Sequence, residues 1–405
     1  MKTTAPAAPP PAERTPRIDF RDTATAYAHK TDAELRRTYW LFRFMNDPRL
    51  VRWGSALARR AVAWDLPFAE RVTLATIYRQ FVGGQTLLGV DAVARELARS
   101  RVLTCLDYGA EGKEDERAYN HTMTECIRAL TFASEGDAMP VVSTKLTGLC
   151  PNRLLERLSA GASFDEGDEA DHAALLKRVD SLCHVASING VQLYVDAEES
   201  WMQDAIDQVV LLAMRRYNRE RAVICNTYQL YRHDRLATLQ AHHASCRSHG
   251  VVFGAKLVRG AYMDKERARA TERGTPSPIQ PNKAATDRDF DAAVAYCLDH
   301  VDTLEFVNAS HNQPSALAMA EGMATRGIAP AHASVMYCQL YGMSDVMTYN
   351  LAAAGYRVAK YVPYGPVKEV VPYLVRRAQE NTSVTGEASR ELGLVREEMG
   401  RRGMG

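Results

Sequence analysis

Residues 222–258 read AVICNTYQLYRHDRLATLQAHHASCRSHGVVFGAKLV. Two short apolar runs rich in β-branched residues, 222–228 and 251–258, are separated by a stretch with helical spacing at 236–249. A strand, a helix and a second strand in this order predict a βαβ unit, in which the two strands lie parallel in one sheet.

The same alternation continues along most of the chain. The apolar runs that predict strands are 102–108, 140–146, 191–196, 222–228, 251–258, 304–309, 334–339 and 356–362. The amphipathic stretches that predict helices include 201–217, 236–249, 290–301, 315–326, 344–354 and 367–379. Eight such strands alternating with helices predict an α/β fold, a (β/α)8 TIM-type barrel, with a doubly wound open sheet as the alternative.

The segments outside this alternation have a different character. Residues 1–18 are rich in Pro, Ala and Thr without hydrophobic periodicity, so we expect a flexible tail. Residues 19–100 have helical spacing and predict an N-terminal helical arm. The barrel is then expected over 101–390, followed by a C-terminal tail at 391–405.

Composition excludes several classes of protein. The chain has 405 residues with 50 Lys plus Arg against 49 Asp plus Glu, so its formal charge of +1 provides no general attraction for nucleic acid. Its 8 Cys include no CxxC pair or zinc-like Cys/His spacing, which favours buried thiols in a reducing compartment. No apolar run reaches the roughly 20 residues of a membrane span. We expect a cytoplasmic protein; the basic, acid-poor start leaves a mitochondrial transit peptide as the alternative.

Polar and ionisable residues gather where the predicted strands end. In a (β/α)8 barrel the active site lies at the C-terminal strand ends, and a buried charge is costly unless it is paired or functional. These residues are Asp107, Glu111, Lys145, Asp196, Asn226, Tyr228, Lys256, Arg259, Ser310, His311, Asn312, Gln339 and Tyr361. Together they predict a site, although any one of them, Lys145 included, could be a paired structural charge.

The last predicted helix carries Tyr373, Arg376, Arg377 and Glu380, so much of one face is cationic. Two adjacent guanidinium groups after the eighth strand could bind a small carboxylate or phosphate. A solvated surface patch is the alternative.

Several motifs are absent, and this narrows the chemistry. The chain has no GxGxxG after a strand, no P-loop, no GxSxG and no HExxH. His233, His249 and His311 have no metal-ligand spacing. We therefore expect no metal site.

Three blocks at the predicted strand ends resemble the proline dehydrogenase family, in its monofunctional, eukaryotic-type branch. They are GAKLVRGAYMDKERA (254–268), VNASHN (307–312) and YVPYGPVKEVVPYLVRRAQEN (361–381). The segment KTDAELRRTYWLFRFMNDPRLV (30–51) is similar to the N-terminal region of that branch. The resemblance extends over roughly residues 102–384.

The resemblance implies an FAD-dependent oxidation of L-proline to 1-pyrroline-5-carboxylate in a (β/α)8 barrel. It implies hydride transfer to flavin N5, and then transfer of the electrons to a membrane quinone, with peripheral contact at the inner membrane. No aldehyde-dehydrogenase-like segment is recognisable, so a separate pyrroline-5-carboxylate dehydrogenase is expected as a partner. Hydroxyproline dehydrogenase is the nearest alternative.

The resemblance also assigns substrate contacts. Lys145, Arg376 and Arg377 would hold the substrate carboxylate and, with Asp196 beside the substrate, form the catalytic set. Glu111 would pair with Arg376 as a gate. The walls around the ring would be Ala261, Leu340, Tyr361 and Tyr373. Family members that prefer hydroxyproline have a smaller residue in place of Tyr361, so proline is the expected substrate.

Cofactor contacts follow from the same resemblance. The residues that match flavin-contacting positions are Asn226, Lys256, Arg259, Gly260, His311, Asn312, Lys283 and Thr286. Asn226 stands where many members have Gln. Lys256 stands where many bacterial members have Arg, and a Lys cannot make the bidentate hydrogen bonds of a guanidinium.

Two other classes of function remain. Lys145 or Lys256 beside Asp196 could form an imine, as in a Schiff-base aldolase. The barrel could also be a scaffold whose Arg-rich last helix binds a partner.

Overall fold

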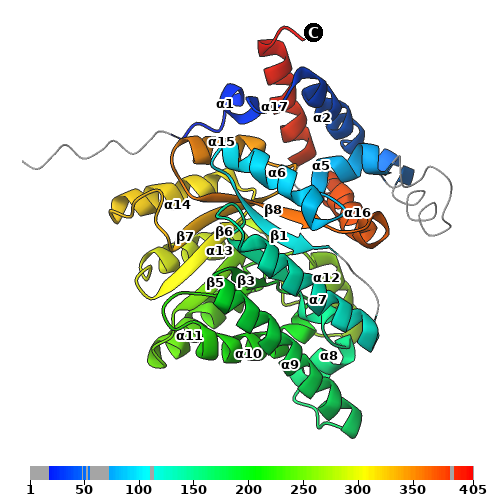
Figure 1. The fold of residues 1–405 in the computed structure, drawn as a ribbon, viewed down its shortest axis with the longest axis vertical. Coiled ribbons are helices and arrows are strands. Elements are labelled where there is room, and N and C mark those ends of the chain that lie inside the picture. Colours follow the sequence, from blue (N-terminus) through cyan, green and yellow to red (C-terminus); the bar gives the residue numbers. More distant parts are fainter. Residues whose placement is uncertain are drawn as a thin grey trace, which may run out of the picture.

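Eight parallel strands close into a barrel in the computed structural model, which describes residues 18–47, 49–51, 53–54, 73–109, 114–383 and 387–404 (Figure 1). Their order around the barrel is their order in the chain, and the last strand pairs with the first. The strands are β1 Leu103–Tyr108, β2 Val141–Thr144, β3 Gln192–Val195, β4 Ile224–Gln229, β5 Phe253–Val258, β6 Leu304–Ala309, β7 Val335–Leu340 and β8 Val358–Tyr364. The predicted barrel is confirmed, and the open-sheet alternative is wrong.

Helices follow the strands and surround the barrel (Figure 1). Between β1 and β4 lie α7 Glu116–Ala133, the 3-10 helix η2 Leu146–Gly148, α8 Asn152–Ser159, α9 Glu166–Asn189 and α10 Ser200–Tyr217. After β4 come α11 Arg235–Ser248, α12 Met263–Arg273, α13 Lys283–Leu298, α14 Gln313–Thr325, α15 Asp345–Ala353 and α16 Val367–Ser383.

The strands are apolar along both faces because both faces are buried. Outward-facing residues such as Leu106, Ile224 and Leu257 belong to the large core beneath the helices. Inward-facing residues such as Cys105 and Val307 fill the barrel itself. All eight cysteines are buried and unpaired, as predicted from their apolar surroundings.

The arm before the barrel consists of helices. These are α1 Thr23–Tyr27, α2 Asp32–Met45, the π-helix η1 Leu74–Tyr78, α5 Arg79–Phe81 and α6 Leu87–Arg99. Thr31 starts α2 with a capping box, in which its hydroxyl accepts from the Glu34 amide and the Glu34 carboxylate accepts from the Thr31 amide. Residues 1–17 of the predicted flexible tail lie outside the described residues.

A buried ion-pair cluster joins the arm to the barrel. Asp345, at the start of α15, lies 2.9 Å from Lys30 of the arm and 2.9 Å from Lys360 of β8. Burial raises the pKa of Asp345, but the two lysines outweigh this effect and hold it well below its ordinary value. His29 stacks on Tyr349 next to this cluster.

The C-terminal segment differs from the prediction. Residues Glu387–Arg401 form α17, which packs beside α1 and α2 (Figure 1), so 391–401 is helix and not a tail. Val395 of this helix is fully buried, and Arg402 donates to the carbonyls of Tyr27 and Lys30. These partners lie more than 370 residues away in the chain, so local sequence signals could not reveal them.

In the described part of the chain, no helix has the length and hydropathy that a bilayer span requires.

Candidate active site

A hydrogen-bonded cluster lies inside the barrel at the C-terminal ends of the strands. Asp196 follows β3, and its carboxylate accepts from the Lys256 ammonium at 2.6 Å and from the Ser143 hydroxyl at 2.8 Å. The Tyr361 hydroxyl donates to its other oxygen at 2.9 Å. The Lys256 Nζ also lies 4.7 Å from the centre of the Tyr361 ring. Strands β2, β3, β5 and β8 therefore bring one anion and one cation together.

The charges of this pair stabilise each other. Burial raises the pKa of Asp196, but the Lys256 charge and its hydrogen bond outweigh burial and hold the pKa below its ordinary value. Burial lowers the pKa of Lys256, yet Asp196 outweighs that effect and raises it. Both groups are therefore charged at neutral pH.

Two further carboxyl groups near this cluster have raised pKa values. Burial and the neighbouring Asp196 charge raise the pKa of Asp107 to about 6, while Lys145 opposes the shift. Burial raises the pKa of Glu198 to about 7, against the Lys145 charge and the hydrogen bonds from Thr147. The sequence identified Asp107 as a strand-end charge without a role, and it did not identify Glu198.

Cations from two distant segments reach the barrel mouth. Lys145 directly follows β2, and Arg376 is half-buried on α16. Both charges lower the pKa of Tyr262, against the dominant effect of burial, which raises it. Both charges therefore act on the same tyrosine, and the Lys145 charge also lowers the pKa of Asp196 in the cluster.

Arg377 stacks on a tyrosine of its own helix. Its guanidinium lies 5.4 Å from the centre of the buried Tyr373 ring. Its charge also acts on His311, after β6, where burial and then Lys360, Arg377, Arg390 and Arg259 lower the pKa to about 3.

Arg259, one residue after β5, is held in an extended network. Its guanidinium donates to Asp287 at 2.7 Å, to Ser310 at 2.6 Å and to Ser315 at 2.9 Å. Asp287 also pairs with Lys283, so these two predicted cofactor residues share one carboxylate. Thr286 lies beside them on α13 and is buried.

His311 and Asn312 complete this side of the mouth. The His311 ring contacts the Ser344 hydroxyl at 2.7 Å, and Asn312 caps α14 by accepting from the Ser315 amide at 3.0 Å. Ser344 in turn donates its amide to Glu391 of α17 at 3.1 Å. The segment expected to be a tail therefore supports this side of the site.

Gly260 and Ala261 lie exposed between β5 and α12. Gly260 has φ +141°, and a Cβ there would lie 2.4 Å from the Tyr231 ring, so no other residue fits without strain. Leu340 ends β7 and packs against the barrel interior. Glu111 lies outside the described residues, so its predicted pairing with Arg376 stays a prediction.

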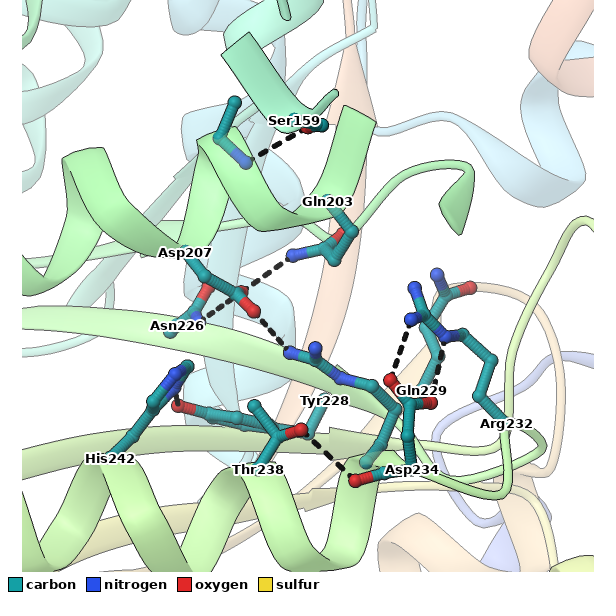
Figure 2. Close-up of polar contacts among 12 residues, drawn as sticks. Ser159, Gln203, Asp207, Asn226, Tyr228, Gln229, Arg232, Asp234, Thr238 and His242 are labelled. Carbon is teal, nitrogen blue, oxygen red and sulfur yellow. Dashed lines mark hydrogen bonds and ion pairs between the residues drawn. The ribbon is translucent and has the colours of Figure 1, made fainter. Parts of the chain in front are cut away.

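The predicted position of Asn226 at the mouth is wrong. Asn226 pairs with Ala255 in the sheet and faces outward, where its amide donates to Asp207 of α10 at 2.8 Å (Figure 2). Side chains alternate between the two faces of a strand, so the inward positions of β4 are Cys225, Thr227 and Gln229. Gln229, at the end of β4, accepts from the Ala261 amide at 3.1 Å. The register that pairs Thr227 of β4 with Lys256 of β5 identifies this inward face.

No group of three metal-ligating side chains occurs within the described ranges. The cluster is instead built from one carboxylate, basic groups and a tyrosine, an arrangement that can bind a small anionic molecule against an apolar wall.

Comparison with known proteins agrees with this geometry. The family model described as proline dehydrogenase matches residues 90–390, which includes every strand of the barrel. The chain belongs to the proline dehydrogenase family. Membership in this family makes it an oxidoreductase.

Relatives in the proline dehydrogenase family have several names. "Carbapenem antibiotics biosynthesis protein CarD" of Pectobacterium carotovorum is 35% identical, over 80% of this chain and 84% of the relative. Hydroxyproline dehydrogenase of Xenopus laevis is 31% identical, over 92% and 88%. Mitochondrial proline dehydrogenase 1 of Homo sapiens is 41% identical, over 59% of this chain but 40% of the relative.

Solved structures of proline utilization A proteins share the fold. Proline utilization A from Bdellovibrio bacteriovorus, inactivated by N-propargylglycine, superposes with a TM-score of 0.71 at 20% identity. The match extends over 89% of this chain and 38% of that one. At this identity the match demonstrates the barrel alone.

Proposed function

We propose that this protein oxidises L-proline to 1-pyrroline-5-carboxylate with FAD as cofactor, and that the electrons pass on to a quinone. The observation that carries the proposal is the buried Asp196–Lys256–Tyr361 cluster at the C-terminal ends of the strands, with the Lys145 charge acting on the same Asp196 carboxylate. This arrangement suits a small amino acid whose carboxylate needs cations and whose ring needs an apolar wall.

The chain's own residues would bind and orient the substrate. Lys145 and Arg376 would hold its carboxylate, with Arg377 as a further cation on α16. Tyr361 and Tyr373 would form walls around the ring, with Ala261 and Leu340. The surrounding positive charge would lower the pKa of the substrate's ammonium group and favour the neutral amine, which is the form that can donate a hydride.

The residues on the β5 and β6 side of the mouth fit a flavin nucleotide. Four cations, Lys360, Arg377, Arg390 and Arg259, act on His311, and although Lys360 and Arg259 are paired with Asp345 and Asp287, this positive charge suits an anionic diphosphate. Lys256, Arg259, Gly260, His311 and Asn312 would hold the group, with Lys283 and Thr286 further out and Gln229 replacing Asn226. The flavin, when bound, supplies a two-electron acceptor for hydride at N5.

Two alternatives are less well supported. An imine-forming role for Lys256 needs a neutral amine, whereas Asp196 raises the pKa of that lysine. Hydroxyproline oxidation must accommodate the Tyr361 ring, which lies against Lys256 in the barrel.

The first test is the visible spectrum of the purified protein under anaerobic conditions. A yellow flavin spectrum that bleaches with L-proline, and not with hydroxyproline at the same concentration, is expected. Bleaching by hydroxyproline alone would assign the other substrate. A protein that stays colourless after incubation with FAD would contradict the proposal.

Tyr361 is expected to control the choice between the two substrates. Replacing Tyr361 with Ser removes the ring and is expected to raise kcat/KM for hydroxyproline relative to proline by about tenfold or more. Replacing Tyr361 with Phe keeps the ring and removes the hydrogen bond to Asp196, so it should leave the ratio nearly unchanged. Equal ratios in the Ser variant and the wild type would contradict this role.

An exposed face of α2 supports peripheral membrane contact, which transfer of electrons to a quinone requires. Trp40 and Phe44 are 62% and 43% exposed, and the Arg43 guanidinium lies 5.3 Å from the Trp40 ring. Arg36 and Arg37 are exposed one turn earlier. Aromatic rings between cations suit the interface of an anionic bilayer.

Replacing Trp40 and Phe44 together with Ser is expected to weaken binding to anionic vesicles by about tenfold or more, because two apolar side chains no longer insert. Co-sedimentation with phosphatidylglycerol vesicles measures this binding. The control replaces Ile188 of α9 and Leu212 of α10 with Ser. These two side chains are 68% and 55% exposed. An equal loss in both double variants would argue against the α2 face.

We propose a cytoplasmic location, with a separate pyrroline-5-carboxylate dehydrogenase consuming the product. The mitochondrial alternative rests on the names of relatives such as the human enzyme.

A further inference from the structure

A buried ion pair lies outside the barrel, behind β4. Asp207 of α10 accepts from Arg235 of α11 at 2.7 Å, and their side chains are 6% and 2% exposed. The second oxygen of Asp207 accepts from the side-chain amides of Gln203 and Asn226, each at 2.8 Å (Figure 2). Both carboxylate oxygens are therefore in use.

Such a pair contributes little net stability, because removing two charges from water costs about as much as their attraction returns. A well-packed pair of apolar side chains would stabilise this helix layer as well. Because stability does not explain the pair, its role is inferred from the hydrogen bonds of the side-chain amides that contact Asp207.

Gln203 connects the ion pair to the barrel mouth. Its amide nitrogen donates to Asp207, and its amide oxygen accepts from the backbone amide of Glu198 at 2.8 Å. A carboxylate only accepts hydrogen bonds, so it selects the orientation of the Gln203 amide that turns the oxygen toward Glu198.

The chain of hydrogen bonds continues across the mouth. The Glu198 carbonyl accepts from Gln229 at 2.7 Å, and Gln229 accepts from the Ala261 amide at 3.1 Å. The Glu198 carboxylate accepts from the Thr147 amide and hydroxyl at 3.1 and 2.6 Å. The segments after β2 and β5 and the end of β4 are thus tied to the segment after β3, which Gln203 holds.

We propose that Asp207, with Arg235, is a positioning residue that orders the substrate side of the barrel mouth through Gln203. The charge outside the barrel sets the orientation of one amide, and this amide sets the path of the segment after β3. Ala261, a proposed wall of the substrate pocket, is placed by the same chain of bonds. The part that concerns substrate rests on the proposed function.

The main test is Asp207→Asn, which keeps the shape of the side chain. In this variant the side-chain oxygen at position 207 stays on the Arg235 guanidinium and the new NH2 group faces Gln203, so the Gln203 amide must turn over and its oxygen no longer accepts from the Glu198 amide. KM for proline is expected to rise about tenfold, the effect of one lost buried hydrogen bond, with kcat changed less than about twofold. Hydrogen exchange measured by mass spectrometry should be faster in peptides spanning residues 197–203.

A double variant that moves the carboxylate from position 207 to position 203 should restore KM and hydrogen exchange. In the double variant Asp207→Asn, Gln203→Glu, the new carboxylate can accept both from the Glu198 amide and from the side-chain amide introduced at position 207. Asn226 can turn to match, because its side-chain oxygen has no hydrogen-bond partner in the structure. KM and exchange should return to within about threefold of wild type, since the acceptor is restored.

The control is Asp180→Asn. Asp180 accepts from Arg216 and Tyr217 at the other end of α10, at 2.8 and 2.7 Å, with Arg216 67% exposed. It should change neither KM nor exchange in residues 197–203.

A lower melting temperature of Asp207→Asn with unchanged KM and unchanged hydrogen exchange would overturn the proposal. A double variant that restores neither KM nor hydrogen exchange would also overturn it. If Asp207→Asn does not fold, Gln203→Met keeps the ion pair and removes the acceptor. It should then show the same KM and exchange changes, and unchanged values would overturn the proposal. Hydrogen exchange is measured without substrate. A wild-type protein that does not oxidise proline would therefore contradict the proposed function and leave the positioning role of Asp207 testable by exchange.

Discussion

Replacing Arg376 with Met is expected to raise KM for proline by about a hundredfold or more. Hydrogen bonds to charged groups contribute about 1.5–3 kcal/mol each, and a guanidinium can make two with one carboxylate. Arg376 is half-buried on α16, and its charge, like that of Lys145, acts on Tyr262. Steady-state kinetics over a wide range of proline concentrations measures the change.

Arg396→Met is the matched control. Arg396 lies exposed on α17 and stacks on Tyr39, 5.6 Å from the ring centre, away from the barrel mouth. The same loss of charge and size there should leave KM within about twofold, as for most surface substitutions. An unchanged KM in the Arg376 variant would contradict its assignment to the carboxylate.

Replacing Lys256 with Met is expected to lower the free energy of unfolding by about 3–5 kcal/mol, because Asp196 is left as a buried charge without its cation. Urea denaturation of the protein without added ligand measures the loss. The penalty should shrink as the pH falls. Without Lys256 the pKa of folded Asp196 rises above its unfolded value, and a protonated carboxyl needs no cation.

Two comparisons make this test specific. Arg95 lies 2.6 Å from Asp91, the same distance as Lys256 from Asp196, but Arg95 is 77% and Asp91 27% exposed. Arg95→Met should therefore cost less than about 1 kcal/mol. Adding Asp196→Asn to Lys256→Met should recover much of the stability, since no uncompensated charge remains. Equal losses in the Lys256 and Arg95 variants would contradict a buried pair.

The helical end of the chain illustrates why local sequence signals are not sufficient. Residues 391–401 carry many charges, and their apolar residues alone did not indicate a buried face. In the structure Glu398 is fully buried beside Arg401 and Arg402, and Val395 packs into the core. The surface that covers them comes from the arm at the opposite end of the chain.

The position of Asn226 has a different explanation. Its place near a strand end was correct, but successive residues of a strand point to opposite faces. If the assigned position is wrong by one residue, or by three, a side chain expected in the barrel interior lies in the helix layer instead. The inward residue, Gln229, was identified only when the pairing of β4 with β5 placed Thr227 beside Lys256.

The sequence by itself determined the barrel, because parallel strands buried on both faces must be apolar throughout and must alternate with amphipathic helices. It also placed Lys145, Asp196, Lys256 and Tyr361 near strand ends, since these positions follow from the length of each apolar run. Only the tertiary structure decided which of the charges meet, such as Asp196 with Lys256, and that Gln203 bridges Glu198 and Asp207. Such contacts join residues from different βαβ units, and their distances depend on strand register and helix packing, which no local pattern encodes.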